Sequence, residues 1–243
     1  MSRTNNIPKT DRTSYSRDNT KLLRGDASCL TYDVHEGTVV IADSAFARCP
    51  RITEVQLPRS ITTIGSEAFS GCAQISVIDI PDGVETIGSR AFKGCSSLSS
   101  VTLPDNVGEI GDFAFKKCSS LRMVRLPSKI KTISPWCFND CAMLSNVTIP
   151  STVTTIGYGA FCGCTSLTEV EIPASVQFVD CFAFRDCMQL ATVRILNPNL
   201  EVGNFAFNCC PSMQQIIVPR GTLDRFKKVF PPEMTDKLTV ASK

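Results

Sequence analysis

The sequence has 243 residues, enough for one large core or for a stack of smaller units. With 25 basic and 23 acidic residues its net charge is +2, which argues against a chain that binds nucleic acid or an anionic membrane through its overall charge. No apolar run approaches the roughly 20 residues of a membrane-spanning helix, so no transmembrane segment is expected.

Residues 1–28 are polar and carry six basic residues against three aspartates. Such a segment has too few apolar residues to bury, so we expect a disordered N-terminal tail, with a basic docking tail as the alternative. The tail has no apolar stretch typical of a secretory signal, which favours a cytoplasmic location. The cell surface, or secretion by an unrecognised route, is the alternative location. Residues 30–40 are expected to form an N-terminal capping strand of a domain that spans residues 29–219.

One pattern recurs eight times, every 23 residues and without an insertion. Such a fixed period is the mark of a repeat architecture in which each unit buries its apolar side against the next. The phenylalanines of the repeat are Phe46, Phe69, Phe92, Phe115, Phe138, Phe161, Phe184 and Phe207. The cysteines are Cys49, Cys72, Cys95, Cys118, Cys141, Cys164, Cys187 and Cys210. We expect each set to form a buried column.

Each unit reads C-x-x-L-x-x-V-x-L-P-x-x-V-x-x-I-G-x-x-A-F-x-x-C. Its L-x-x-V-x-L piece, such as residues 98–103, alternates like a strand, and the proline that usually follows ends the strand. The A-F-x-x-C piece is expected to be a short helical or 3₁₀ arc. The pattern therefore predicts an α/β solenoid of about eight 23-residue coils with a parallel strand face.

The combination of these segments over about residues 38–219 resembles the BspA-type leucine-rich repeats. The resemblance implies a leucine-rich-repeat superhelix. Many members of that family are surface proteins of bacteria and protists that adhere to host proteins or cells, although relatives also occur inside cells. An adhesin role is therefore implied only as an alternative function.

Residues 220–243 follow the last repeat and are expected to form a C-terminal cap helix and tail. Thr222 is a candidate N-cap, and Leu223, Phe226 and Phe230 share one helical face that would cover the last coil. Pro231 and Pro232 end the helix.

Catalytic and cofactor motifs are missing from the sequence. Histidine occurs once, at His35, outside the repeats, and there is no glycine-rich phosphate-binding motif. Cys162-Gly163-Cys164 looks like half of a zinc site, but no second half has matching spacing. We therefore expect no enzyme activity, no cofactor, no metal and no small-molecule substrate.

The periodic cysteines allow two interpretations. Adjacent strands are close enough for a disulfide between neighbouring coils. Buried free cysteine, however, packs as a small apolar residue, and we favour free thiols.

The strand residues that alternate outward vary in charge and shape, as a recognition surface requires, although a solvated face fits them equally well. They lack the stacked aromatics or basic stripe that nucleic acid needs. We expect an interaction scaffold that binds a protein partner on this face, with the irregular coils near Trp136 and Asn197 as the other candidate surface. The predicted partner-binding residues are Glu54, Gln56, Asp79, Arg122, Met123, Arg125, Glu169, Glu171 and Arg194.

Overall fold

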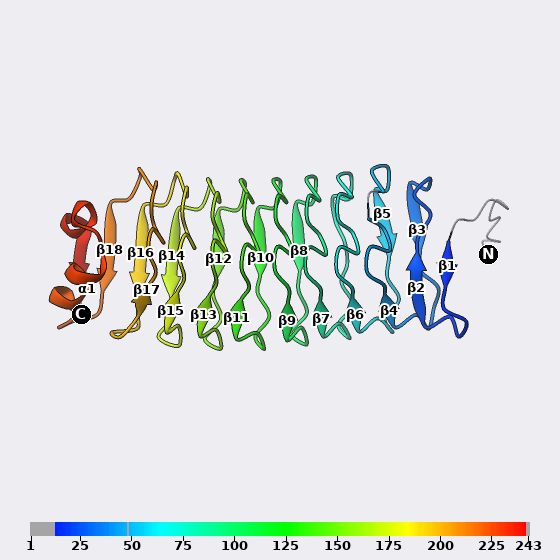
Figure 1. Cartoon of the computed structure of the whole chain (residues 1–243), viewed down its shortest axis with the longest axis horizontal. Coiled ribbons are helices and arrows are strands. Elements are labelled where there is room, and N and C mark those ends of the chain that lie inside the picture. Colours follow the sequence, from blue (N-terminus) through cyan, green and yellow to red (C-terminus); the bar gives the residue numbers. More distant parts are fainter. Residues whose placement is uncertain (1–12, 48, 242–243) are drawn as a thin grey trace.

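The computed structural model describes residues 13–47 and 49–241. They form a parallel β-solenoid of about ten turns, with β1 and α1 at opposite ends of the stack (Figure 1). Each turn runs through a longer strand, a corner, a two-residue strand and an arc of turns, and then enters the next longer strand. The α/β solenoid with a parallel strand face is confirmed.

The longer strands form one side of the solenoid, which we call the strand face. Within the repeats they pair in parallel at a spacing of 23 residues, so that Met123 lies between Ser100 and Asn146. Val77 joins this side through an isolated bridge to Ser100. The strands are β3 (Thr31–Asp33), β5 (Glu54–Gln56), β8 (Ser100–Thr102), β10 (Met123–Arg125), β12 (Asn146–Thr148), β14 (Glu169–Ile172), β16 (Thr192–Ile195), β18 (Gln215–Val218) and β19 (Leu238–Val240).

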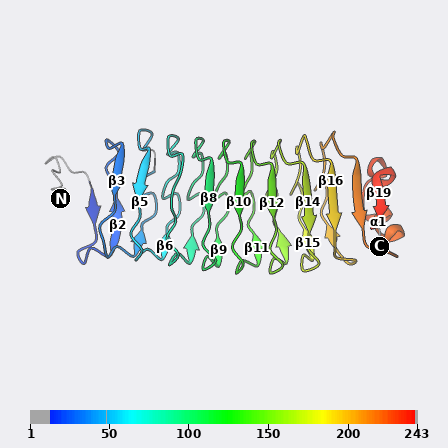
Figure 2. The same cartoon turned by 180° about the vertical axis from the view of Figure 1, so that it is seen from behind.

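Shorter strands form a second side and are visible beside the longer ones in the view from behind (Figure 2). Each has only two residues because a glycine or another corner residue follows its isoleucine or valine. Those of the repeats are β4 (Val40–Ile41), β6 (Thr63–Ile64), β7 (Thr86–Ile87), β9 (Glu109–Ile110), β11 (Thr132–Ile133), β13 (Thr155–Ile156), β15 (Phe178–Val179) and β17 (Glu201–Val202).

The A-F-x-x-C segments form the third side, which we call the arc face. Instead of continuous helical or 3₁₀ segments, they are single 3₁₀-type turns, such as the bond from the Cys72 N–H to the Phe69 carbonyl (3.1 Å). Residues with positive φ, such as Glu67 (56°), separate these turns and prevent a helix from continuing. Neighbouring arcs are joined by backbone hydrogen bonds, for example from the Phe69 N–H to the Ala91 carbonyl (2.7 Å).

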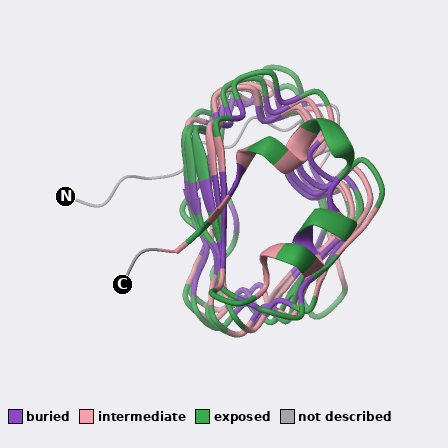
Figure 3. Cartoon of the chain, turned by 90° about the vertical axis from the view of Figure 1, so that its left-hand side faces the viewer, coloured by how far each residue is buried: buried purple, intermediate pink, exposed green. Residues whose placement is uncertain are grey.

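The core lies inside the ring of three sides, and buried residues occur on each of these sides (Figure 3). The eight repeat phenylalanines form the expected column, with neighbouring ring centroids 5.1–5.4 Å apart and almost parallel planes. All eight are at most 2 % exposed. Phe230 of the C-terminal cap extends the column beyond Phe207 at 5.8 Å.

The periodic cysteines are buried free thiols with a shared hydrogen bond. From the second onward, each Sγ–H donates to the carbonyl of the phenylalanine 26 residues earlier, as from Cys118 to Phe92 at 3.2 Å. Burial raises the pKa of these thiols, to about 12 for Cys72 and Cys210. The repeat therefore uses cysteine both as a small apolar residue and as a donor to the preceding turn.

The thiols should accordingly resist modification in the native protein, because the reactive thiolate is suppressed and the sulfur is inaccessible. A neutral-pH reaction with a maleimide should label the exposed Cys209 and the half-buried Cys181 and Cys29 first. Mass spectrometry should show the eight periodic cysteines labelled only after unfolding. Rapid native labelling of Cys118 or Cys164, or a bridge between periodic cysteines, would contradict this.

The N-terminal segment differs from the expected disordered tail. Residues 1–12 of that segment lie outside the described residues, but β1 (Ser14–Tyr15) and β2 (Lys21–Arg24) extend the shorter-strand side. Leu22 of β2 is fully buried beside Ile41, and that contact supplies the apolar burial that orders the segment. The antiparallel strand β1 therefore covers this end on the shorter-strand side, and β3, which pairs with β5, is the outermost strand of the strand face at the same end.

The C-terminal segment covers the last repeat. It comprises the helix α1 (Leu223–Val229), the 3₁₀ helix η1 (Pro232–Lys237) and β19, which adds a parallel strand beside β18. Phe226 and Phe230 are buried as expected, and Leu223 packs beside the core. Thr222 occupies the N-cap position, but its hydroxyl donates to the Pro219 carbonyl (2.7 Å) instead of accepting from the helix.

Candidate functional site

All nine predicted partner-binding residues are exposed; alternation along the strand face points eight of them outward, and Arg122 lies just before β10. In β14, Val170 and Ile172 point into the core, so Glu169 and Glu171 between them must point outward. Parallel pairing then aligns side chains from successive turns in rows, with Glu169 opposite Thr192 and Glu171 opposite Arg194. The rows gather the nine residues into three parts of one face.

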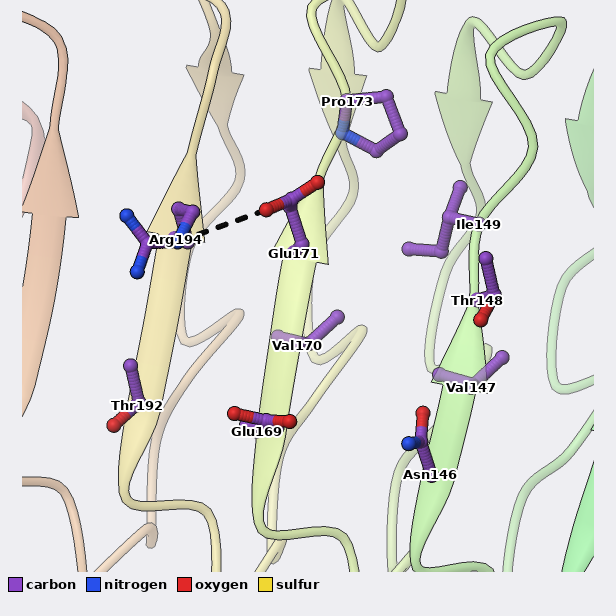
Figure 4. Close-up of a pocket in the computed structure, with 10 residues that line it drawn as sticks. All are labelled: Asn146, Val147, Thr148, Ile149, Glu169, Val170, Glu171, Pro173, Thr192 and Arg194. Atoms are coloured by element: carbon purple, nitrogen blue, oxygen red, sulfur yellow. Dashed lines mark ion pairs between the residues drawn. The ribbon is translucent and has the colours of Figure 1, made fainter.

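The C-terminal part of the face is a hollow of about 290 Å³ above β12, β14 and β16 (Figure 4). Two rows of side chains line it: Thr148, Glu171 and Arg194 form one row, and Asn146, Glu169 and Thr192 form the other. Glu171 and Arg194 form an ion pair at 3.6 Å, whereas Glu169 makes no ion pair within the described part of the chain. The hollow therefore keeps one unpaired carboxylate among hydrogen-bonding groups.

The N-terminal part is a hollow of about 330 Å³ beside β5, and it is acidic. It brings together the predicted residues Glu54, Gln56 and Asp79. The Gln56 side-chain amide donates to the Glu54 carboxylate, which holds the two side chains against each other. This part has two carboxylates and no basic lining residue.

The middle part is centred on β10, where Arg122, Met123 and Arg125 are exposed; Met123 is 68 % exposed. Arg125 pairs at 2.9 Å with Asp105 from the corner of the preceding turn. The hydrogen bond from Arg125 lowers the pKa of the Asp105 carboxyl, and the Ser128 N–H adds to the effect. Of the three residues only Arg125 lines a hollow, one of about 390 Å³ beside β8, together with Asp82 and Asp105. The sequence analysis missed both aspartates because they follow the strands rather than lie within them.

The irregular coil near Asn197 has a structural role. Asn197 is 9 % exposed, its amide donates to the Val176 carbonyl (2.6 Å), and its side-chain oxygen accepts from the Asn199 N–H (2.8 Å). Trp136 lies on the arc face and stacks on Phe113 at a centroid distance of 6.4 Å. Neither Trp136 nor Asn197 therefore adds an exposed side chain to the strand face.

Across residues 13–47 and 49–241, no group of three or more His, Cys, Asp or Glu side chains is arranged to hold a metal ion. His35 stacks on Tyr15 at 4.3 Å in the N-terminal turn, outside the three hollows. No helix in the described segments is both long and apolar enough to cross a membrane. The strand face presents charged and hydrogen-bonding side chains on a parallel sheet.

The repeat pattern described as "BspA type Leucine rich repeat region" matches residues 39–167 and 131–232, in six copies. The chain belongs to the BspA-type leucine-rich-repeat family. Members of this family are repeat scaffolds, generally without enzymatic activity, and leucine-rich-repeat proteins generally bind other proteins. A search of the curated proteins finds no match to this chain.

Solved structures of other leucine-rich-repeat proteins share the fold. The Treponema pallidum leucine-rich-repeat protein is 23 % identical, with a TM-score of 0.62 and coverage of 98 % of this chain and 99 % of that one. A leucine-rich-repeat protein from Bacteroides ovatus is 22 % identical, with a TM-score of 0.61 over 98 % and 77 % of the two chains. The pneumococcal vaccine antigen PcpA is 17 % identical, with a TM-score of 0.59 over 88 % and 66 %.

Proposed function

We propose that this BspA-type chain is a non-enzymatic scaffold that binds a protein partner on its strand face. The observation that carries the proposal is the hollow over β12, β14 and β16, where Glu169 is unpaired and hydrogen-bonding side chains surround it. The parallel sheet fixes the backbone positions of these groups, so binding requires no ordering of the backbone.

The order of acidic and basic residues along the strand face indicates which kind of protein surface would bind there. Acidic groups at Glu54 and Asp79 are followed by the basic Arg122 and Arg125 and then by Glu169 and Glu171, of which Glu171 is paired with Arg194. A protein surface with the opposite order of charges would match this pattern, and such complementarity governs association rate and specificity. Met123 offers an exposed, flexible apolar side chain at the centre that can anchor an interface.

The double substitution Arg122→Glu with Arg125→Glu tests the face. It should lower the free energy of unfolding by no more than about 0.5 kcal/mol, because both residues are exposed and the Arg125–Asp105 pair is a surface pair. It should also weaken binding to the partner recovered by pull-down of the intact chain, mainly through a slower, salt-dependent association measured by surface plasmon resonance.

Matched charge reversals on the shorter-strand side, Glu85→Lys and Lys131→Glu, are the controls, since both residues are exposed and lie away from the hollows. They should leave binding unchanged. If these two changes abolish binding while the strand-face pair does not, the partner binds another side of the solenoid.

The location of the protein decides which partners it meets. The cytoplasmic location expected from the sequence gains no support from the family match, and the alternative of a surface or secreted adhesin stays open to test. Asn146-Val147-Thr148 is an N-glycosylation sequon, and Asn146 lines the C-terminal hollow. A glycan on Asn146 would fill that hollow, so intact-mass analysis of native protein tests both its exposure to glycosylation and the availability of the face.

A further inference from the structure

The last arc of the solenoid carries two unpaired backbone donors. In every earlier arc of the repeats, two N–H groups that are two residues apart donate to two separate carbonyls of the next arc; one such bond runs from Phe184 to Ala206 (2.7 Å). The equivalent donors of the last arc are the N–H groups of Phe205 and Phe207. Neither has a hydrogen-bond partner in the described part of the chain. By the geometry of the earlier arcs, both point away from the stack toward α1 at its end (Figure 1).

The C-terminal cap does not supply carbonyls for these donors. At the repeat spacing the acceptors would be Lys227 and Val229, which follow Asn204 and Ala206 by 23 residues. Both residues belong to α1, and the carbonyls of a helix lie along its own axis. Phe230, in contrast, keeps the repeat position and continues the phenylalanine column. The cap therefore replaces the buried ring of a further arc but not its two backbone acceptors.

A hollow of about 400 Å³ lies between the last arc and the cap, and we call it the end hollow. Residues 202–208 line it from the arc and residues 228–234 from the cap. Phe205 is 61 % exposed, and within the described segments its ring stacks only on Phe182, at a centroid distance of 5.7 Å. The end hollow thus combines two free backbone donors with an aromatic ring that has one open face.

We propose that the end hollow binds a short segment of a partner protein that adopts the arc conformation and continues the row of arcs. The chain itself shows what such a segment needs, because Asn204-Phe205-Ala206 binds the preceding arc in this way. It supplies two carbonyls two residues apart, an aromatic ring between them, and a small residue at the second carbonyl. That last position holds alanine or cysteine in every repeat. The matching ligand is a peptide of the form polar–aromatic–small.

The donors favour a peptide over a single anion. In all earlier arcs the two N–H groups reach separate carbonyls instead of converging on one oxygen, so two acceptors along one backbone fit them best. The end hollow lies at the end of the stack, away from the hollows of the strand face. The inference therefore goes beyond the proposed function, and either site can be tested without the other.

Amide hydrogen exchange followed by NMR tests the donors in the free protein. Phe184 and Phe207 occupy the same position in successive arcs, but only the Phe184 N–H is hydrogen-bonded. The Phe207 amide should therefore exchange faster than that of Phe184, by on the order of 10-fold or more. Equal protection of the two amides would show that the Phe207 donor is already satisfied and would overturn the proposal.

The peptide acetyl-Gly-Asn-Phe-Ala-Gly-amide is the probe for binding. It copies residues 203–206 and ends in glycine, because Phe230 already fills the place of the next ring. Titration to about 10 mM should shift the amide protons of Phe205 and Phe207 downfield. We expect a dissociation constant on the order of 1 mM, since the probe makes two hydrogen bonds and one stacked ring and its phenylalanine must adopt positive φ.

Changes in the probe separate its two contacts. An ester in place of the Ala–Gly amide weakens the second carbonyl as an acceptor and should raise the dissociation constant by about two- to fivefold. Serine in place of the phenylalanine removes the stacked ring and should raise it by about fivefold or more. A probe that shifts neither amide at 10 mM, or binds equally well after both changes, would overturn the proposal. Inorganic phosphate that shifts the same amides more strongly than the probe would do so too.

Matched variants of the protein complete the test. Phe205→Asn should weaken binding of the probe by about fivefold or more, and asparagine keeps the backbone because it tolerates positive φ. Leu196→Ser, at an exposed apolar residue outside the end hollow, should leave binding unchanged. Circular dichroism reports whether each variant is folded. A folded Phe205→Asn variant that binds the probe like the wild type would contradict the assigned site.

Discussion

Replacing Phe115 by alanine should lower the free energy of unfolding by about 3–5 kcal/mol, the usual loss for a buried ring. Phe115 is fully buried and stacks on Phe92 at 5.2 Å and on Phe138 at 5.4 Å. Its removal leaves a cavity in the middle of the column, with rings on both sides that backbone hydrogen bonds between the arcs hold in place. Chemical denaturation followed by circular dichroism measures the loss, and Phe161→Ala should behave in the same way.

Phe205→Ala is the matched control. It removes the same group from a position that is 61 % exposed, and its effect should stay below about 1 kcal/mol. An unchanged denaturation midpoint for Phe115→Ala, or equal losses at the two positions, would contradict a fold stabilised by the phenylalanine column.

Raising the pH above 9 should unfold the protein through its buried thiols. Burial raises the pKa of Cys72 and Cys210 to about 12, and raises that of Cys118, Cys164 and Cys187 well above the ordinary value of 9.0. Below pH 8 the thiols are protonated in both states, so they add no pH dependence. Above pH 9 the unfolded chain loses thiol protons that the folded chain keeps, and stability falls as the pH rises toward the folded-state values.

The effect is large because many thiols act together. Each contributes a slope of about 1.4 kcal/mol per pH unit, so several of them exhaust a typical stability of 5–15 kcal/mol within about two units. Urea unfolding between pH 7 and pH 11, under reducing conditions, measures the slope. Cys118→Ala should reduce that slope by one thiol's share, whereas replacement of the exposed Cys209 should not. A urea midpoint that stays constant between pH 8 and pH 10 would show that the thiols are not protected by burial.

The sequence alone was enough to predict the repeats, because the same inward positions recur every 23 residues. The turn that contains β2 could not be predicted from this period. Lys21 of β2 lies opposite Val40 of β4, a spacing of 19 residues, so a search at the repeat period passes over it. The backbone conformation of the arcs could not be predicted from the sequence either, because positive φ occurs at residues as different as Glu67, Arg90 and Phe113.

The strand-face residues were predictable because alternation alone decides which side chains point outward. The residues of the same chain that pair with them could not be predicted, because Arg125 contacts Asp105 only through the stacking of neighbouring turns. The aromatic contacts on the surface of the arc face could not be predicted for a similar reason. Their column begins only at Phe113 and moves by one residue at Tyr158, because a Cβ at Gly159 would collide with Trp136.

The hydrogen bonds between turns have a consequence for how the protein can change in length. Within the repeats they follow fixed separations, with strand residues paired at 23 residues and each thiol donating to a carbonyl 26 residues earlier. Excising one unit, such as residues 96–118, joins Cys95 to Ser119 and restores every such separation. Recombination between repeats in the coding sequence can therefore shorten or lengthen the solenoid by whole turns, and each event adds or removes one side chain in each row of the strand face.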